Sequence, residues 1–244
     1  MRILLITAAL LPLAACHASW DHDGAGGGHN AKAAGPVATR SYDLAGFTAV
    51  DLRGSDDVEV KVGGAFSVKA EGGQNILDDL DITVVNGTLR VTRKSHDNWS
   101  WGDHDGVRVM VTMPAINAAS VGGSGDLRVD RAQGDFKGAV GGSGNLTVGT
   151  IGGGAVDLAI GGSGDLTVSG TATSLSASVA GSGDIDAKGL SATSAHVSVV
   201  GSGSVTGTVK GDADVSIAGS GDVTLVGGAK CKVSSVGSGE ARCS

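Results

Sequence analysis

The segment from residue 95 to residue 105 contains the densest group of side chains that could bind a ligand. These candidate residues are His96, Trp99, Trp101, Asp103, His104 and Asp105. Indole rings offer large flat surfaces to a carbohydrate, whereas imidazole and carboxylate groups bind metal ions. The sequence leaves two alternatives open: a carbohydrate- or metal-binding loop, or a solvated hairpin loop whose tryptophans cover the edge of the fold.

Cys16 is a candidate site of covalent modification. It follows a basic residue, Arg2, an apolar run from Ile3 to Leu13, and two alanines. A run of this length is too short to span a bilayer and is typical of a cleaved signal peptide. The tetrapeptide Leu-Ala-Ala-Cys resembles the bacterial lipobox, whose cysteine carries lipid on its thiol. We therefore predict a lipoprotein signal peptide at residues 1–15 and a lipid anchor on Cys16. The alternative is an ordinary secretory signal that leaves a free thiol.

Cys231 and Cys243 are candidates for a disulfide bond. Each stands where earlier copies of the repeat described below have apolar residues, so both side chains should point into the core of the last turn, from opposite walls. A bond between them would close about a dozen residues and stabilise the fold by roughly 3 kcal/mol in the loop-entropy model. Disulfides persist in oxidising compartments. The alternative is two small buried thiols.

The chain that carries these residues has a strong internal repeat. A Gly-Ser-Gly triplet recurs at steps of 18 to 20 residues through the last half of the sequence. Its central serines are Ser124, Ser143, Ser163, Ser182, Ser202, Ser220 and Ser238. A repeat of such constant length indicates one structural unit stacked on itself.

Apolar residues alternate with small or polar ones on both sides of each triplet. Three residues before the central serine stand Val121, Val140, Ile160, Val179, Val199 and Ile217. This alternation predicts strands with one buried face, and two strands per 18 to 20 residues leave no room for a helical crossover. We therefore predict an all-β fold, a right-handed parallel β-solenoid with about 18–20 residues per turn, in which glycine forms the corners.

An acidic column follows the triplets. Two residues after the serine stand Asp126, Asn145, Asp165, Asp184, Ser204, Asp222 and Glu240. The string Gly-Gly-Ser-Gly-Asp resembles a calcium-binding nonapeptide repeat, but leucine stands where that motif needs its next carboxylate, for example at Leu127. The other interpretation is that Asp, Asn and Ser side chains hydrogen-bond the corner backbone. We favour the second and predict no metal site there and no cofactor.

The first half of the chain is less regular. Residues 16–40 are rich in Gly, Ala and His without periodicity, which predicts a flexible tether. Alternating strings predict an irregular region of β-strands over residues 41–115, before the repeats at 116–244. Within it, Asn86-Gly87 predicts a hairpin turn, and Gln74 to Leu80 a short helix. The formal net charge of −7 argues against a nucleic-acid partner.

Two segments and the repeats together carry a family resemblance. The run Phe47-Thr-Ala-Val-Asp-Leu-Arg-Gly-Ser, then Asn86-Gly-Thr-Leu-Arg-Val, lead into repeated Gly-Ser-Gly-Asp-Leu. This combination resembles the bacterial putative auto-transporter adhesin head GIN domain family over residues 42–240. The resemblance implies a secreted or lipid-anchored β-solenoid domain, here at residues 41–244, with no catalytic residues to carry over.

The sequence therefore predicts a non-enzymatic, lipid-anchored cell-envelope protein, held at the outer membrane and facing the periplasm or the surface. Its partners would be the membrane, through the lipid, and an envelope protein or glycan. The binding surface would be a wall of small residues: Ser120, Ala139, Ala159, Ser178, Ser198, Ser216 and Ser234.

The alternatives are a passive structural lipoprotein, a β-helix carbohydrate-active enzyme and an ice-binding solenoid. Against an enzyme, the basic residues lie in different columns, and we expect His196 to lack an acidic neighbour at one fixed spacing. An ice-binding surface would need an unbroken column of threonines, but the column of Thr147, Thr167, Thr206 and Thr224 is interrupted by Arg128, Asp186 and Arg242.

Overall fold

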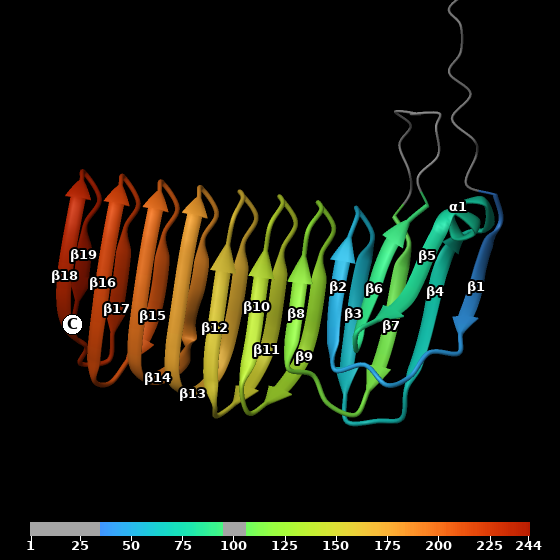
Figure 1. Cartoon of the computed structure of the whole chain (residues 1–244), viewed down its shortest axis with the longest axis horizontal. Helices are drawn as coiled ribbons and strands as arrows, with labels where there is room; N and C mark the ends of the chain where they lie inside the picture. Colours follow the sequence, from blue (N-terminus) through green and yellow to red (C-terminus); the bar gives the residue numbers. More distant parts are fainter. Residues whose placement is uncertain (1–34, 95–105) are drawn as a thin grey trace, which may run out of the picture. The chain divides into compact units, whose positions relative to one another are not determined.

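The computed structural model describes residues 35–94 and 106–244. All of them belong to one compact unit, Ala31–Ser244. Within the described ranges the chain is all-β apart from one short helix, α1 (Gln74–Asp79). The strands coil into a β-solenoid of about 7 turns, which confirms the predicted fold class (Figure 1).

Each turn contributes one strand to a first wall and one strand to a second wall. The first wall consists of β2 (Ala49–Arg53), β6 (Thr88–Arg93), β8 (Ala118–Val121), β10 (Phe136–Val140), β12 (Ala155–Ile160), the C-terminal halves of β13 (Leu166–Gly181) and β14 (Ile185–Gly201), β16 (Asp212–Gly219) and β18 (Lys230–Gly237). The second wall consists of β3 (Asp57–Val62), β7 (Arg108–Met113), β9 (Leu127–Gln133), β11 (Leu146–Gly152), the N-terminal halves of β13 and β14, β15 (Val205–Val209), β17 (Val223–Val226) and β19 (Ala241–Cys243). In Figure 1 the chain rises through the first wall in front and descends through the second wall behind while it advances toward its C-terminus, which is a right-handed path.

The aliphatic columns predicted from the repeat line up in register inside the two walls. Val140 pairs with Ile160, Ile160 with Val179, and Val179 with Val199. All four side chains are at most 2% exposed. The alternating pattern therefore identified the buried face correctly, because inward positions recur at every second residue of each strand.

Glycine forms the corners because the backbones of successive turns almost touch there. The N–H groups of Ser163 and Gly164 both donate to the Gly142 carbonyl one turn away, at 3.0 and 3.1 Å. A Cβ on Gly162 would lie 2.1 Å from that same oxygen. The same paired hydrogen bonds recur at every Gly-Ser-Gly triplet from Ser124 to Ser238. Backbone hydrogen bonds therefore connect the corners of successive turns, and we call this series the corner ladder.

The region before the repeats is more regular than predicted. β2 and β3 form a full turn, and β6 and β7 form another, in register with the repeats. The turns are stacked out of sequence order, because β2 lies between β6 on one side and β8 on the other (Figure 1). The corner ladder accordingly begins at Gly54, whose carbonyl accepts from the N–H groups of Ser124 and Gly125.

Antiparallel strands complete the N-terminal part of the sheet. β4 (Ser67–Gly73) pairs with β7 and with β1 (Val37–Tyr42), and β5 (Leu80–Val85) pairs with β6. The β5–β6 hairpin turns at Asn86 and Gly87, both with positive φ, as predicted. Helix α1 lies where a short helix was predicted, ends at Asp79, and buries Ile76 and Leu77. The boundary of the tether is corrected, since β1 begins at Val37 and pairs with β4 before residue 40.

Candidate functional site

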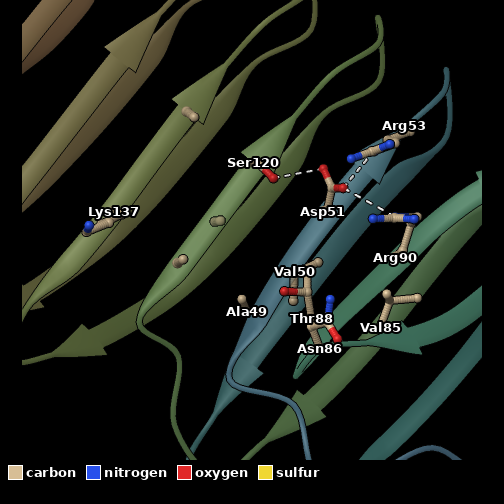
Figure 2. A pocket seen from close by; sticks show the side chains of 13 residues that line it. Ala49, Val50, Asp51, Arg53, Val85, Asn86, Thr88, Arg90, Ser120 and Lys137 are labelled. Carbon is tan, nitrogen blue, oxygen red and sulfur yellow. Dashed lines mark hydrogen bonds and ion pairs between the residues drawn. The ribbon is translucent and has the colours of Figure 1, made fainter.

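A groove of about 350 Å³ crosses the outer face of the first wall where β10, β8, β2 and β6 lie side by side (Figure 2). Its floor is made of the small side chains Ala49, Ala118 and Ala139. Val85 and Asn86, from the β5–β6 hairpin, form one bank. The alanine floor leaves the backbone of the wall open to a ligand, so polar side chains around it decide what can bind.

Asp51 lies in the middle of this groove and is largely buried, with 13% of its side chain exposed. Its Oδ1 accepts a hydrogen bond from the Ser120 hydroxyl at 2.8 Å, and its Oδ2 accepts one from Arg53 Nε at 2.7 Å (Figure 2). The register explains the contact with Ser120, because Asp51 and Ser120 are direct partners on β2 and β8. The carboxylate is therefore already hydrogen-bonded at both oxygens.

Two further cations line the groove without a hydrogen-bonded anion. Arg90 is the partner of Asp51 on β6, but its Nε lies 3.6 Å from Asp51 Oδ2, which is beyond hydrogen-bonding distance. That Nε is buried and has no hydrogen-bond partner within the described ranges. Lys137 lies on β10 at the other side of the groove (Figure 2). No ion pair joins it to Asp157, its register partner on β12. The residues that line the groove carry three cations and one carboxylate, a formal charge of +2, and Asp135 and Asp157 line the adjoining hollow together with Lys137.

The groove opens onto the predicted wall of small residues. Starting at Asp51, register pairs run along the wall through Ser120, Ala139, Ala159, Ser178, Ser198, Ser216 and Ser234. All of these small side chains face outward and are exposed or half-buried. The predicted wall therefore exists as one continuous outward column.

The predicted ligand loop lies outside the described residues, as do His96, Trp99, Trp101, Asp103, His104 and Asp105. The end of β6, before this loop, and the residue before β7, after it, both hydrogen-bond to the carboxylate of Asp56. Asp56, which is fully buried, accepts hydrogen bonds from Arg93 and from the backbone N–H of Val107. Hydrogen bonding to Asp56 raises the pKa of Arg93 above its ordinary value.

Two of the three cysteines form the predicted disulfide. Cys231 on β18 and Cys243 on β19 are bonded across the last turn, with 6.3 Å between their Cα atoms. They stand in register with the buried residues Ala213 and Leu225, so both point inward from opposite walls, as predicted. Cys16, the predicted lipidation site, lies outside the described residues.

The acidic column hydrogen-bonds backbone from turn to turn. Asp165 Oδ1 accepts from the N–H of Asp184, and Asp184 Oδ1 accepts from the N–H of Ser204, at 3.1 and 2.7 Å. Asn145 makes the same contact with Asp165, at 3.1 Å. In the part of the chain that the structure describes, no three His, Cys, Asp or Glu side chains gather to hold a metal ion. The hydrogen bonds from backbone N–H groups to Asn145, Asp165 and Asp184 are those that the backbone interpretation predicts.

The expectation that His196 lacks an acidic neighbour is wrong. Asp214 on β16 is its direct register partner, and Lys232 on β18 is the partner of Asp214. These three exposed side chains line a second shallow hollow of about 300 Å³ on the first wall. No hydrogen bond or ion pair joins them within the described residues, so they form no acid–base pair in this structure.

Sequence reasoning missed the groove because it treated Asp51, Arg53 and Arg90 only as parts of alternating strands. A detectable signal was present, since charged residues occupy outward positions of strands whose counterparts in the repeats are small. Which turn lies beside which was not deducible, because the sequence order of the turns differs from their order in the stack.

The sequence profile of the family described as "Putative auto-transporter adhesin, head GIN domain" matches residues 46–229. A putative adhesin of Bacteroides fragilis NCTC 9343 has a solved structure with a TM-score of 0.75 at 20% identity, over 86% of this chain and 97% of that chain. A putative lipid binding protein of Parabacteroides distasonis ATCC 8503 gives 0.66 at 22% identity, with the same coverage of both chains. A putative adhesin of Parabacteroides merdae ATCC 43184 gives 0.63 at 16%, again with that coverage.

These structural likenesses show a shared fold. No curated protein sequence matches the chain. Because the family profile spans most of the solenoid, from β2 to the start of the last turn, the chain belongs to the putative auto-transporter adhesin, head GIN domain family.

Proposed function

We propose that this chain is a lipid-anchored, non-enzymatic protein of the cell envelope that binds another surface through the outer face of its first wall. The observation that carries the proposal is the continuous column of small outward residues from Ser120 to Ser234. A surface without large side chains lets a partner approach the backbone along several turns. Membership in an adhesin-like family supports the same function.

The proposed lipid anchor rests on the sequence around Cys16. The described part of the chain contains no helix with the length and apolar character needed to cross a bilayer. Replacement of Cys16 by Ser should move the full chain from the membrane fraction to the soluble fraction of its host. A Cys16→Ser chain that stays with the membranes would rule out the anchor without touching the adhesive function.

The proposed absence of catalysis rests on the arrangement of the polar groups. Acid–base catalysis on a polysaccharide needs two carboxyl groups, or an acid and a base, on either side of one bond. In the groove, Asp51 already accepts hydrogen bonds at both oxygens from Ser120 and Arg53. Asp51 therefore serves to position the side chains around it, and we propose that the groove binds a ligand without acting on it.

Binding of the purified full chain to intact cells and isolated envelopes tests the adhesive function. Ala159→Arg places a long charged side chain on the column of small residues and should abolish binding. Thr167→Arg is the matched control, because Thr167 is exposed on the second wall of the same repeat. Equal binding by both variants would exclude the first wall, and no binding by the unmodified chain would leave a passive structural role.

A further inference from the structure

We propose that the groove around Asp51 is a binding site for an acidic oligosaccharide, recognised through its carboxylate groups. The proposal rests on the proposed function, since it specifies what kind of surface the first wall binds. Its starting point is the charge of the groove. The chain as a whole carries a formal charge of −7, yet three cations, Arg53, Arg90 and Lys137, line this groove together with one carboxylate. A local cationic hollow on an acidic protein attracts anions in preference to its surroundings.

The hydrogen-bonding capacity of these cations is largely unused. Arg53 uses its Nε for Asp51, and its two terminal nitrogens make no hydrogen bond within the described residues. Arg90 has a buried Nε without a hydrogen-bond partner, and Lys137 makes no ion pair within the described residues. The Arg90 side chain as a whole is 34% exposed, so an anion in the groove can reach the part of it that faces solvent.

The position of Asp51 explains why the groove keeps two arginines close together. Its carboxylate lies between Arg53 and Arg90 and offsets the repulsion between them (Figure 2). Asp51 is held in turn by Ser120, so it cannot swing away to release either arginine. Both arginines line the groove with terminal nitrogens that Asp51 does not use, and a guanidinium edge matches a carboxylate with two parallel hydrogen bonds.

The shape of the groove favours an oligosaccharide over a peptide. Lys137 lies three strand positions from Thr88, which at about 4.8 Å per strand is roughly 14 Å. An extended peptide usually binds a sheet by pairing with a free strand edge. β2 has no free edge, since β6 and β8 pair with it on its two sides. A ligand here must bind through its substituents, and a chain of acidic sugars carries carboxylates and hydroxyls along its length.

The test is calorimetric titration of the purified full chain with trigalacturonic acid at low salt. Its methyl ester is the matched ligand, because it keeps the sugar backbone and loses the charge. We expect the acid to bind at least tenfold more tightly than the ester, and added salt to weaken binding. Equal binding of acid and ester, or no binding of the acid, would overturn the proposal.

Variants connect the binding to this groove. Arg90→Gln and Lys137→Gln should each weaken binding of the acid about tenfold. Lys137 is exposed and unpaired, so its replacement leaves the fold intact even if the Arg90 variant is unstable. Arg128→Gln is the control, since it removes one charge from the second wall beside Asp126 and should change nothing. Unchanged binding in Lys137→Gln and in a folded Arg90→Gln would overturn the assignment.

Hexaglutamate serves as a further ligand. If it binds through Arg90 and Lys137 more tightly than trigalacturonic acid, the groove recognises acidic protein and the oligosaccharide proposal is wrong. The cell-binding assay separates this outcome from failure of the proposed function. Suppose that cells bind the unmodified chain and the Arg90→Gln chain equally well, but do not bind the Ala159→Arg chain. This result would support adhesion through the first wall and would exclude the acidic-sugar site.

Discussion

Asp56 and Arg93 form a buried ion pair between the corner of one turn and the end of the neighbouring strand. Arg93 donates from Nη2 to Asp56 Oδ1 at 2.5 Å and from Nε to Oδ2 at 3.1 Å. The Val107 backbone N–H donates to Oδ1 at 3.0 Å. One carboxylate therefore links β6, the segment before β7 and the β2–β3 corner.

Replacement of Asp56 by Ala should lower the free energy of unfolding by about 3 kcal/mol, because it leaves Arg93 largely buried without its counter-charge. Asp56→Asn should cost less, since the amide oxygen can still accept from Val107. Urea unfolding followed by circular dichroism measures both. Glu240→Ala is the control, because it breaks the exposed pair with Arg242 and should cost under about 1 kcal/mol. Similar losses in Asp56→Ala and Glu240→Ala would contradict this account.

The corner ladder predicts a sharp difference between two adjacent glycines. A Cβ on Gly162 would lie 2.1 Å from the Gly142 oxygen, whereas a Cβ on Gly161 would meet no atom within 4 Å. Gly162→Ala should therefore separate two turns and destabilise the protein by more than about 2 kcal/mol. Gly161→Ala should be nearly neutral. Thermal unfolding of the two variants side by side is the measurement, and equal melting temperatures would show that the corner is not closely packed.

The repeats were predictable because each position meets the same surroundings in every turn. Val140, Ile160, Val179 and Val199 follow from alternation alone, and the disulfide follows from two cysteines at inward positions of one turn. The spatial order of the first turns was not predictable. Alternation specifies which face of a strand is buried, but it carries no information on which strand lies next to it.

That missing information hid the polar cluster around Asp51. Arg90 lies beside Asp51 because β6 lies outside β2, although β6 follows β2 in the sequence. The pair of His196 and Asp214 was predictable, because each stands six residues before a central serine, Ser202 or Ser220, and the register follows that alignment. A search for one fixed spacing missed the pair, since the shift is 18 residues here and 20 residues in the preceding turn.

The acidic column predicts that an amide can replace a carboxylate without loss. Asn145 already makes the contact with Asp165 that Asp165 makes with Asp184. Asp165→Asn should keep the free energy of unfolding unchanged, and Asp165→Ala should lower it by about 1 kcal/mol. Urea unfolding with and without calcium checks this. A calcium-dependent rise in stability that disappears in Asp165→Ala would instead favour a cation site.

The disulfide stabilises the last turn. Cys231 and Cys243 are separated by 12 residues, and closing such a loop is worth about 3 kcal/mol in the chain-entropy model. In a solenoid the effect should stay local, because each turn contacts only its neighbours. Hydrogen exchange of the Cys231→Ala/Cys243→Ala chain should therefore show faster exchange in β18 and unchanged exchange in β10. Uniform loss of protection along the whole solenoid would contradict this.

Tyr42 makes the stability sensitive to alkaline pH. Burial raises its pKa above the ordinary 10.0, and the neighbouring Arg40 offsets this only in part. The unfolded chain therefore loses the phenolic proton first. The stabilising contribution is fully present below about pH 10 and is lost as the pH rises through the folded-state pKa. Tyr42 is the only tyrosine, so ultraviolet absorbance reports its titration directly. Tyr42→Phe should remove this part of the alkaline loss of stability while it leaves stability near pH 7 almost unchanged. A native titration midpoint at or below that of the urea-unfolded chain would show that burial does not control this group.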